Sequence, residues 1–233
     1  WPPMPHAGST SMCMHPWYRL KRFDSTHQLM FSDRTSAGVE LARLLEKYRQ
    51  QANTVVLAVP RGGVPVGVAV ARELGLPLDL VLTKKIGHPT NREYAIGAAT
   101  LTNRLLVPHA DVDPDYIEAE TGRVRERLRE MERLFRPGKP PLNVKGATVI
   151  IVDDGIATGN TLLATLQLLR KQQPARLVVA VPVAPEGAAD RFKEAADEFV
   201  CAYTPPYFTG VGAFYEQFHQ VSDEEVVELL GEE

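Results

Sequence analysis

The chain has 233 residues, 44% of them hydrophobic, which suits one large domain or one domain with an added lobe. Its formal net charge of −3 shows no basic excess, and this argues against a nucleic-acid-binding protein. The 2 cysteines have no metal-ligand spacing, which is typical of a reduced, cytoplasmic protein rather than a disulfide scaffold. No apolar run approaches the roughly 20 residues of a membrane span, and no secretory leader is visible.

The first 29 residues are rich in Pro, His, Met and Ser and show no period of 2 or 3.6. We therefore predict that residues 1–29 are an extension outside the core. From Met30 onward the pattern becomes regular, and Ser32 or Asp33 is placed to cap a helix. The predicted core runs over residues 30–206.

Five apolar, β-branched runs follow, and helical patterns come after several of them. Strands apolar on both faces and separated by helices indicate a mainly parallel sheet covered on both sides, a doubly wound α/β fold. In such sheets ligands bind outside the carboxyl ends of the strands. The predicted strands are 54–60, 78–85, 147–154, 176–183 and 199–204.

Two segments depart from this alternation. Residues 110–143 form a helical excursion whose charged helix, 113–136, keeps its apolar residues on one face, so we predict a cover helix with its arginines in solvent. The tail 207–233 is aromatic-rich. Either segment is a candidate for a small hood over a ligand. The tail aromatics could instead fill the core or a homodimer contact; they are Tyr207, Phe208, Phe214, Tyr215 and Phe218.

The stretch "VIIVDDGIATGNT" at 149–161 ends a buried strand on two carboxylates and then enters a helix. Its small-residue loop would present backbone amides at the positive end of the helix dipole, which is an anion site. It lacks the lysine of a P-loop. The carboxylates repel phosphate but accept hydrogen bonds from hydroxyl groups, so ribose 5-phosphate satisfies both parts. The predicted contacts are Asp153, Asp154, Gly155, Ala157, Thr158, Gly159, Asn160 and Thr161.

This stretch resembles the phosphoribosyl-diphosphate-binding motif of type I phosphoribosyltransferases. The resemblance extends over residues 30–230 and is closest to a group of poorly characterised, predicted bacterial phosphoribosyltransferases. It is carried by "VPRGGV" at 59–64, "KKIGHPTNREYAIGA" at 84–98 and "VGAFYEQFHQVSDEEV" at 211–226.

The resemblance implies a diphosphate loop at Pro60, Arg61 and Gly62, with Lys84 as a further contact. Arginine suits this role because its planar fork can bind two oxygens at once. The family also implies Mg²⁺, held mainly by the substrate. Asp153 and Asp154 are the possible protein ligands of that ion.

A mobile catalytic loop is expected after the second strand. Lys85 and Glu93 are its candidate catalytic residues, and His88 is a second candidate for the general base. The alternative is a rigid hairpin over the same residues. Ala157 stands where the hypoxanthine–guanine branch carries an aspartate, so the resemblance argues against that branch and leaves adenine open.

The function implied is Mg²⁺-dependent displacement of diphosphate from phosphoribosyl diphosphate by a nucleobase-like acceptor. The alternative is a regulatory protein that senses phosphoribosyl diphosphate or a nucleotide and has lost catalysis. A sensor acting on DNA or RNA should show a recognition module or a basic face, and the sequence shows neither.

Overall fold

The computed structural model describes the chain except for residues 1–11, 16–17, 22–30, 92–93, 107–111 and 232–233. Within that part the centre is a seven-stranded sheet of order β1-β2-β10-β9-β8-β3-β4, and a separate three-stranded sheet has the order β5-β6-β7. The strands are β1 (Met12–His15), β2 (Tyr18–Lys21), β3 (Thr54–Ala58), β4 (Leu78–Leu80), β5 (Lys84–Gly87), β6 (Ala95–Ala99), β7 (Arg104–Leu106), β8 (Thr148–Val152), β9 (Arg176–Val183) and β10 (Glu198–Tyr203).

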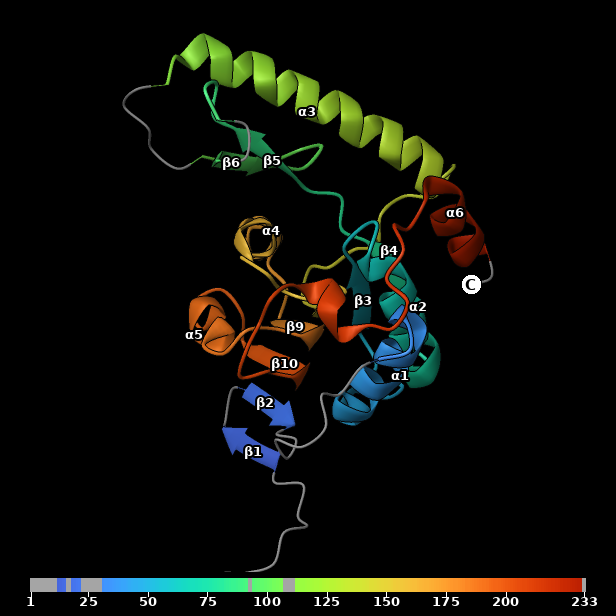
Figure 1. The fold of residues 1–233 in the computed structure, drawn as a ribbon. Coiled ribbons are helices and arrows are strands. Elements are labelled where there is room, and N and C mark those ends of the chain that lie inside the picture. The colour runs from blue at the N-terminus through green and yellow to red at the C-terminus, as the bar shows by residue number, and fades with distance from the viewer. Residues whose placement is uncertain (1–11, 16–17, 22–30, 92–93, 107–111, 232–233) are drawn as a thin grey trace, which may run out of the picture.

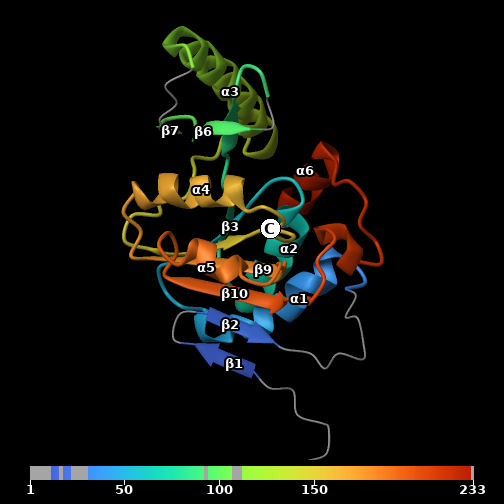
Figure 2. The same ribbon diagram turned by 60° about the vertical axis from the view of Figure 1, so that its left-hand side comes forward.

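Five of the central strands, β10, β9, β8, β3 and β4, run parallel to one another. Helices α1 and α2 cover one face of the sheet, and α4 and α5 cover the other (Figures 1 and 2). The predicted doubly wound α/β fold is therefore confirmed. The helices are α1 (Arg34–Leu44), α2 (Gly63–Leu74), α3 (Pro114–Phe135), α4 (Asn160–Arg170), α5 (Ala188–Phe192) and α6 (Asp223–Gly231), with 3-10 turns η1 (Glu46–Tyr48) and η2 (Val211–Phe214).

The side chains of each central strand point alternately to the two faces of the sheet, so each face has its own hydrophobic core. Val56 packs in the core under α1 and α2, whereas its neighbours Val55 and Leu57 pack in the core under α4 and α5. Successive side chains of a strand point to opposite faces, so a strand covered on both sides must be apolar throughout. This explains the continuous apolar runs in the sequence.

The first helix begins as the sequence predicts. Asp33 is the N-cap of α1: its carboxylate accepts from the Ser36 amide, and the Ser36 hydroxyl lies at 3.1 Å from the Asp33 amide. This reciprocal arrangement satisfies two of the amides that a helix start leaves without partners. It fixes the position of Arg34, the first residue of α1.

The predicted strand 78–85 is wrong in its extent, because the structure divides it into β4 and β5. β4 pairs with β3 only as far as Ala58 and Leu80, and the Val81 amide makes the last bond, to the Ala58 carbonyl. Since β3 ends there and turns into α2, the chain beyond residue 81 has no neighbouring strand to pair with. It leaves the main sheet and enters the smaller one.

The smaller sheet and α3 form a separate layer, which we call the hood (β5, β6, β7 and α3). It lies beyond α4, with α3 as its outermost element and α6 beside one end of that helix (Figure 1). Val124, Leu128 and Phe135 of α3 are buried, which confirms the predicted apolar face of this helix. They share a third core with β5, β6, α2 and α6.

The N-terminal segment adds an antiparallel β1–β2 hairpin to the sheet. β2 runs parallel to β10, with Tyr18 opposite Phe199 and Leu20 opposite Cys201. The sequence does not predict these strands; whether residues 1–29 are dispensable for folding and binding stays a prediction. None of the helices in the described chain combines the length and apolar character needed to cross a bilayer.

Candidate functional site

The two predicted loops meet at the carboxyl ends of neighbouring strands. β3 and β8 pair through Ala58 and Val152, so the turn after β3 lies beside the carboxylates after β8. A Cβ on Gly62 would lie only 2.2 Å from Asp154 Oδ2, and one on Gly63 would lie 2.9 Å from the Asp153 Cα. At Gly63 only glycine permits this approach of the two backbones, and at Gly62 a side chain would displace the Asp154 carboxylate. The peptide bond between Pro60 and Arg61 in the first loop is cis.

The two acidic residues, Asp153 and Asp154, are partly buried, and a hydrogen bond joins them. Asp153 Oδ1 accepts a hydrogen bond of 2.9 Å from the Asp154 amide. Arg34 donates a hydrogen bond of 3.0 Å from Nε to Asp154 Oδ2, and its Nη2 lies 3.0 Å from the same oxygen in an ion pair. Burial raises the pKa of Asp153, and the Asp154 charge raises it further. Burial also raises the pKa of Asp154, and the Arg34 guanidinium opposes that rise.

The loop after the acidic pair leads into α4, as predicted. Gly159 takes a left-handed conformation with φ of 70°, and a Cβ there would lie 2.8 Å from the Phe192 ring. The amides of Ala157 and Thr158 donate no hydrogen bond to any residue that the structure describes. They directly precede the start of α4, and free amides at a helix N-terminus suit an anion.

Four residues at the end of this loop and the start of α4 are exposed to solvent, where a ligand can contact them. Ala157, Thr158, Asn160 and Thr161 are all exposed. The Asn160 side-chain oxygen accepts a hydrogen bond of 2.9 Å from Arg191 of α5. Of the eight predicted ribose and phosphate contacts, six lie between β8 and α4, and Asn160 and Thr161 are the first two residues of α4.

Cationic side chains lie near the predicted diphosphate loop. Arg61 Nη1 lies 3.3 Å from Asp223 Oδ1, at the start of α6. Burial lowers the pKa of the half-buried Lys84 ammonium, the charges of Arg127 and Arg61 lower it further, and the Asp223 carboxylate opposes them. Lys84 thus lies within electrostatic reach of Arg61, although it belongs to the hood.

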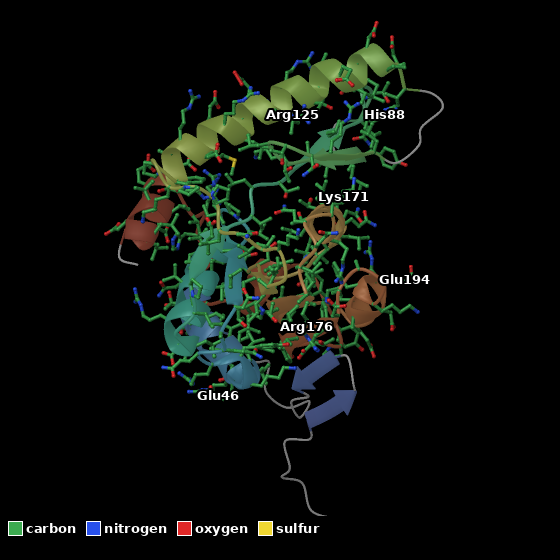
Figure 3. The ribbon with its side chains drawn as sticks, turned by 180° about the vertical axis from the view of Figure 1, so that it is seen from behind. Glu46, His88, Arg125, Lys171, Arg176 and Glu194 are labelled. Carbon is green, nitrogen blue, oxygen red and sulfur yellow. The ribbon has the colours of Figure 1, made fainter. Side chains whose placement is uncertain are left out.

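Two other predicted catalytic residues, Lys85 and His88, also lie in or next to the small sheet of the hood. Lys85 follows Lys84 on β5, and successive strand residues point to opposite faces. His88 lies beside the N-terminal end of α3 (Figure 3), with its Nδ1 at 2.9 Å from the Thr90 hydroxyl, whereas α6 lies near the other end of that helix. Glu93 falls outside the described residues. The hairpin predicted as the alternative is present, and the mobility of its tip stays a prediction.

Sequence reasoning missed the C-terminal contacts with the acidic pair. The Tyr215 hydroxyl donates to the Asp154 carbonyl at 2.6 Å, and the His219 carbonyl accepts from Arg34 Nη1 at 2.8 Å. The Phe218 ring lies 3.9 Å from the Arg34 guanidinium carbon. The contact between Arg34 and His219 joins positions 185 apart in the sequence, and no local pattern signals it.

The possible metal ligands at this site suit a metal ion that is held mainly by a substrate. No group of three or more His, Cys, Asp or Glu side chains with the geometry to hold a metal occurs among the described residues. Mg²⁺ is commonly bound by one or two carboxylates together with substrate phosphates and water. Asp153 and Asp154 supply such carboxylates next to a site with the character of a phosphate-binding loop.

The fold and the site define a domain of the phosphoribosyl transferase family. A family model described as "Phosphoribosyl transferase domain" matches residues 30–212, and the chain belongs to that family. The family membership expected from the sequence is therefore confirmed.

Relatives of the chain carry the same domain. It is 41% identical over 207 residues to proteins of two Mycobacterium tuberculosis strains whose names class them provisionally as phosphoribosyl transferases; the match covers 86% of this chain and 46% of theirs. A ribose-phosphate pyrophosphokinase of Pyrococcus furiosus is 40% identical over 174 residues, 64% of this chain and 62% of that protein. The chain thus spans about half the length of the mycobacterial relatives.

A solved structure resembles the whole arrangement. The crystal structure of TT1426 from Thermus thermophilus is 42% identical and has a TM-score of 0.78. The match covers 88% of this chain and 99% of that one. Most of the fold described above is therefore one that a similar sequence adopts.

Proposed function

We propose that this protein is a phosphoribosyltransferase that uses phosphoribosyl diphosphate as donor, with Mg²⁺, and a nucleobase-like compound as acceptor. The observation that carries the proposal is the meeting of three features at one sheet edge. These are the acidic pair 153–154, the amide-lined loop 155–161, and the cationic group around Arg61. A homodimer and a cytoplasmic location stay predictions.

Each feature matches one part of the donor. The 5-phosphate would bind at the loop amides and the start of α4. The sugar hydroxyls would donate to Asp153 and Asp154, which accept hydrogen bonds when ionised. The diphosphate would bind on the side of Arg61 and Lys84, because both side chains are cationic and interact electrostatically with each other, and because Gly62, which follows Arg61, lies against Asp154.

In the reaction, the bond between the anomeric carbon and the diphosphate oxygen breaks, and the electron pair leaves with the diphosphate. The acceptor nitrogen forms the new bond to that carbon and loses its proton to a base, for which Glu93 and His88 are the candidates. The transition state should resemble an oxocarbenium ion. Arg61 and Lys84 would stabilise the charge that develops on the leaving group. Mg²⁺, when bound, would neutralise part of the same charge.

The acceptor would bind between the core and the hood. Ala157 is exposed in the loop and supplies no carboxylate, so a hypoxanthine–guanine acceptor is disfavoured and adenine remains open. Phe214 and Tyr215 are buried in the main core and are therefore not available to stack on a base. Tyr207 is 87% exposed and remains available.

The first test is calorimetric titration with phosphoribosyl diphosphate and Mg²⁺. The double variant Asp153→Asn/Asp154→Asn should weaken binding strongly, because hydrogen bonds to charged groups are worth about 1.5–3 kcal/mol each. The matched control is Asp190→Asn, a residue of α5 outside the proposed site, which should bind as the wild type does. Equal affinity of the double variant and the wild type would refute the assignment.

The second test identifies the acceptor. Diphosphate release should be measured with a panel of nucleobases, and release that depends on one of them establishes the transferase. Arg61→Ala should abolish most of that release. Tight donor binding without release for any acceptor would favour the sensor function instead.

A further inference from the structure

Arg34 is a charged residue that the structure buries beside the acidic pair. Only 7% of it is exposed, and arginine is rarely buried without a partner. Its hydrogen bond from Nε and its ion-pair contact from Nη2 both reach the same oxygen of Asp154, Oδ2. The other carboxylate oxygen, Oδ1, takes no part in these two contacts. Arg34 thus orients the side chain of Asp154 through one of its two carboxylate oxygens.

Two further contacts hold the guanidinium itself. Nη1 donates to the His219 carbonyl at 2.8 Å, and the Phe218 ring packs against the flat face at 3.9 Å. A planar group bonded along its edge and stacked on its face has little rotational freedom. Tyr215 adds a bond of 2.6 Å to the Asp154 carbonyl. Asp154 is therefore held at its side chain and at its backbone.

The same helix provides a contrast. Arg43 pairs with Glu40 on the surface of α1, with 72% of the arginine side chain exposed. Such pairs contribute little and hold no fixed geometry. Arg34, in contrast, directs its charge at a residue of the proposed ribose site, which lies 120 positions away in the sequence. Burial of this pair is costly unless the geometry is well satisfied, as it is here.

We infer that Arg34 is a positioning residue for the ribose site. It holds the Asp154 carboxylate so that one oxygen is fixed by the protein and the other is presented to a sugar hydroxyl. Through Phe218 and His219 it also makes the C-terminal segment part of that site. The inference rests on the proposed function, because it assigns the role of the ribose contact to Asp154.

The test compares two partial ligands, ribose 5-phosphate and inorganic diphosphate, by calorimetry on the full chain. Arg34→Gln should weaken ribose 5-phosphate binding about tenfold or more, since an oriented hydrogen bond to a charged group is lost. Diphosphate binding should change by less than about twofold, because Arg61 and Lys84 are left intact. Arg34→Lys, which keeps the charge but loses the fork, should fall between. The control Arg43→Gln should leave both affinities unchanged.

A second variant keeps the inference testable if Arg34→Gln does not fold. Phe218 is 37% exposed, so Phe218→Leu should fold while freeing the guanidinium face. It should weaken ribose 5-phosphate binding by about two- to fivefold and spare diphosphate. Equal losses of both ligands, or no loss of either, in whichever variant folds would overturn the inference. A wild-type protein that binds neither ligand would instead refute the proposed function.

Discussion

Asp223 stands where an anionic leaving group is expected to bind. Its carboxylate lies 3.3 Å from Arg61, and its charge also acts on Lys84. Diphosphate entering this place must displace the carboxylate and will be repelled by it. We therefore predict that Asp223→Asn, which removes the charge and keeps the shape, binds inorganic diphosphate more tightly than the wild type.

The size of the gain follows from the exposure of the pair. The side chains of Arg61 and Asp223 are 37% and 46% exposed, so solvent screens their attraction. Pairs of this kind are worth about 0.2–1 kcal/mol, which corresponds to about 1.4- to 5-fold in affinity. Because the effect is electrostatic, it should shrink when the salt concentration is raised towards about 1 M.

Calorimetric titration with diphosphate at low salt measures this gain. The matched control is Glu228→Gln, which removes the same charge from an exposed position of the same helix. If Asp223→Asn binds diphosphate more weakly, the carboxylate orients Arg61 rather than competing for it, and the reasoning is refuted. If the control gains as much, the effect is one of net charge alone.

Three further outcomes are expected. Gly62→Ala should lower the Tm by about 2–12 °C in thermal denaturation, because overpacking costs about 1–3 kcal/mol and Arg34 prevents Asp154 from moving aside. An unchanged Tm would contradict the close approach of Gly62 to the Asp154 carboxylate. Backbone amides of residues 86–94 should exchange fast in the free protein and slow when diphosphate and Mg²⁺ are added, and protection that is present without ligand and unchanged by it would exclude a lid. A chain starting at Met30 should still fold and bind the donor, with some loss of stability because β10 becomes an edge strand; loss of binding would show that the removed hairpin supports the site.

The sequence predicts those features that depend on neighbouring residues. The run from Thr148 to Val152 is apolar almost throughout because both faces of its strand are covered, and that pattern is visible without a structure. The polar residues of the segment that follows lie within a few positions of one another, so candidate contacts could be named residue by residue; their binding of a ligand stays a prediction. The helix start at Asp33 is also local.

Features that depend on distant partners could not be predicted. In the sequence Arg34 is an ordinary charged residue at a helix start, and only the fold brings it to Asp154. The pair of Arg61 and Asp223 spans 162 positions. The division of the predicted strand 78–85 depends on where the neighbouring strand β3 ends, which the residues 78–85 themselves do not determine.

The hood is encoded by one continuous stretch of chain. β5, β6, β7 and α3 all lie between β4 and β8 in the sequence, whereas the loops proposed to bind the donor lie outside that stretch, after β3 and β8. Under the proposed function, a change of acceptor would require the replacement of only one segment of the gene, while the proposed donor loops are inherited intact. The constraint on such an exchange is the shared interface, where Val64 and Val68 of α2 pack in the same core as the hood. Lys84, at the junction, is the hood residue that such an exchange would have to retain.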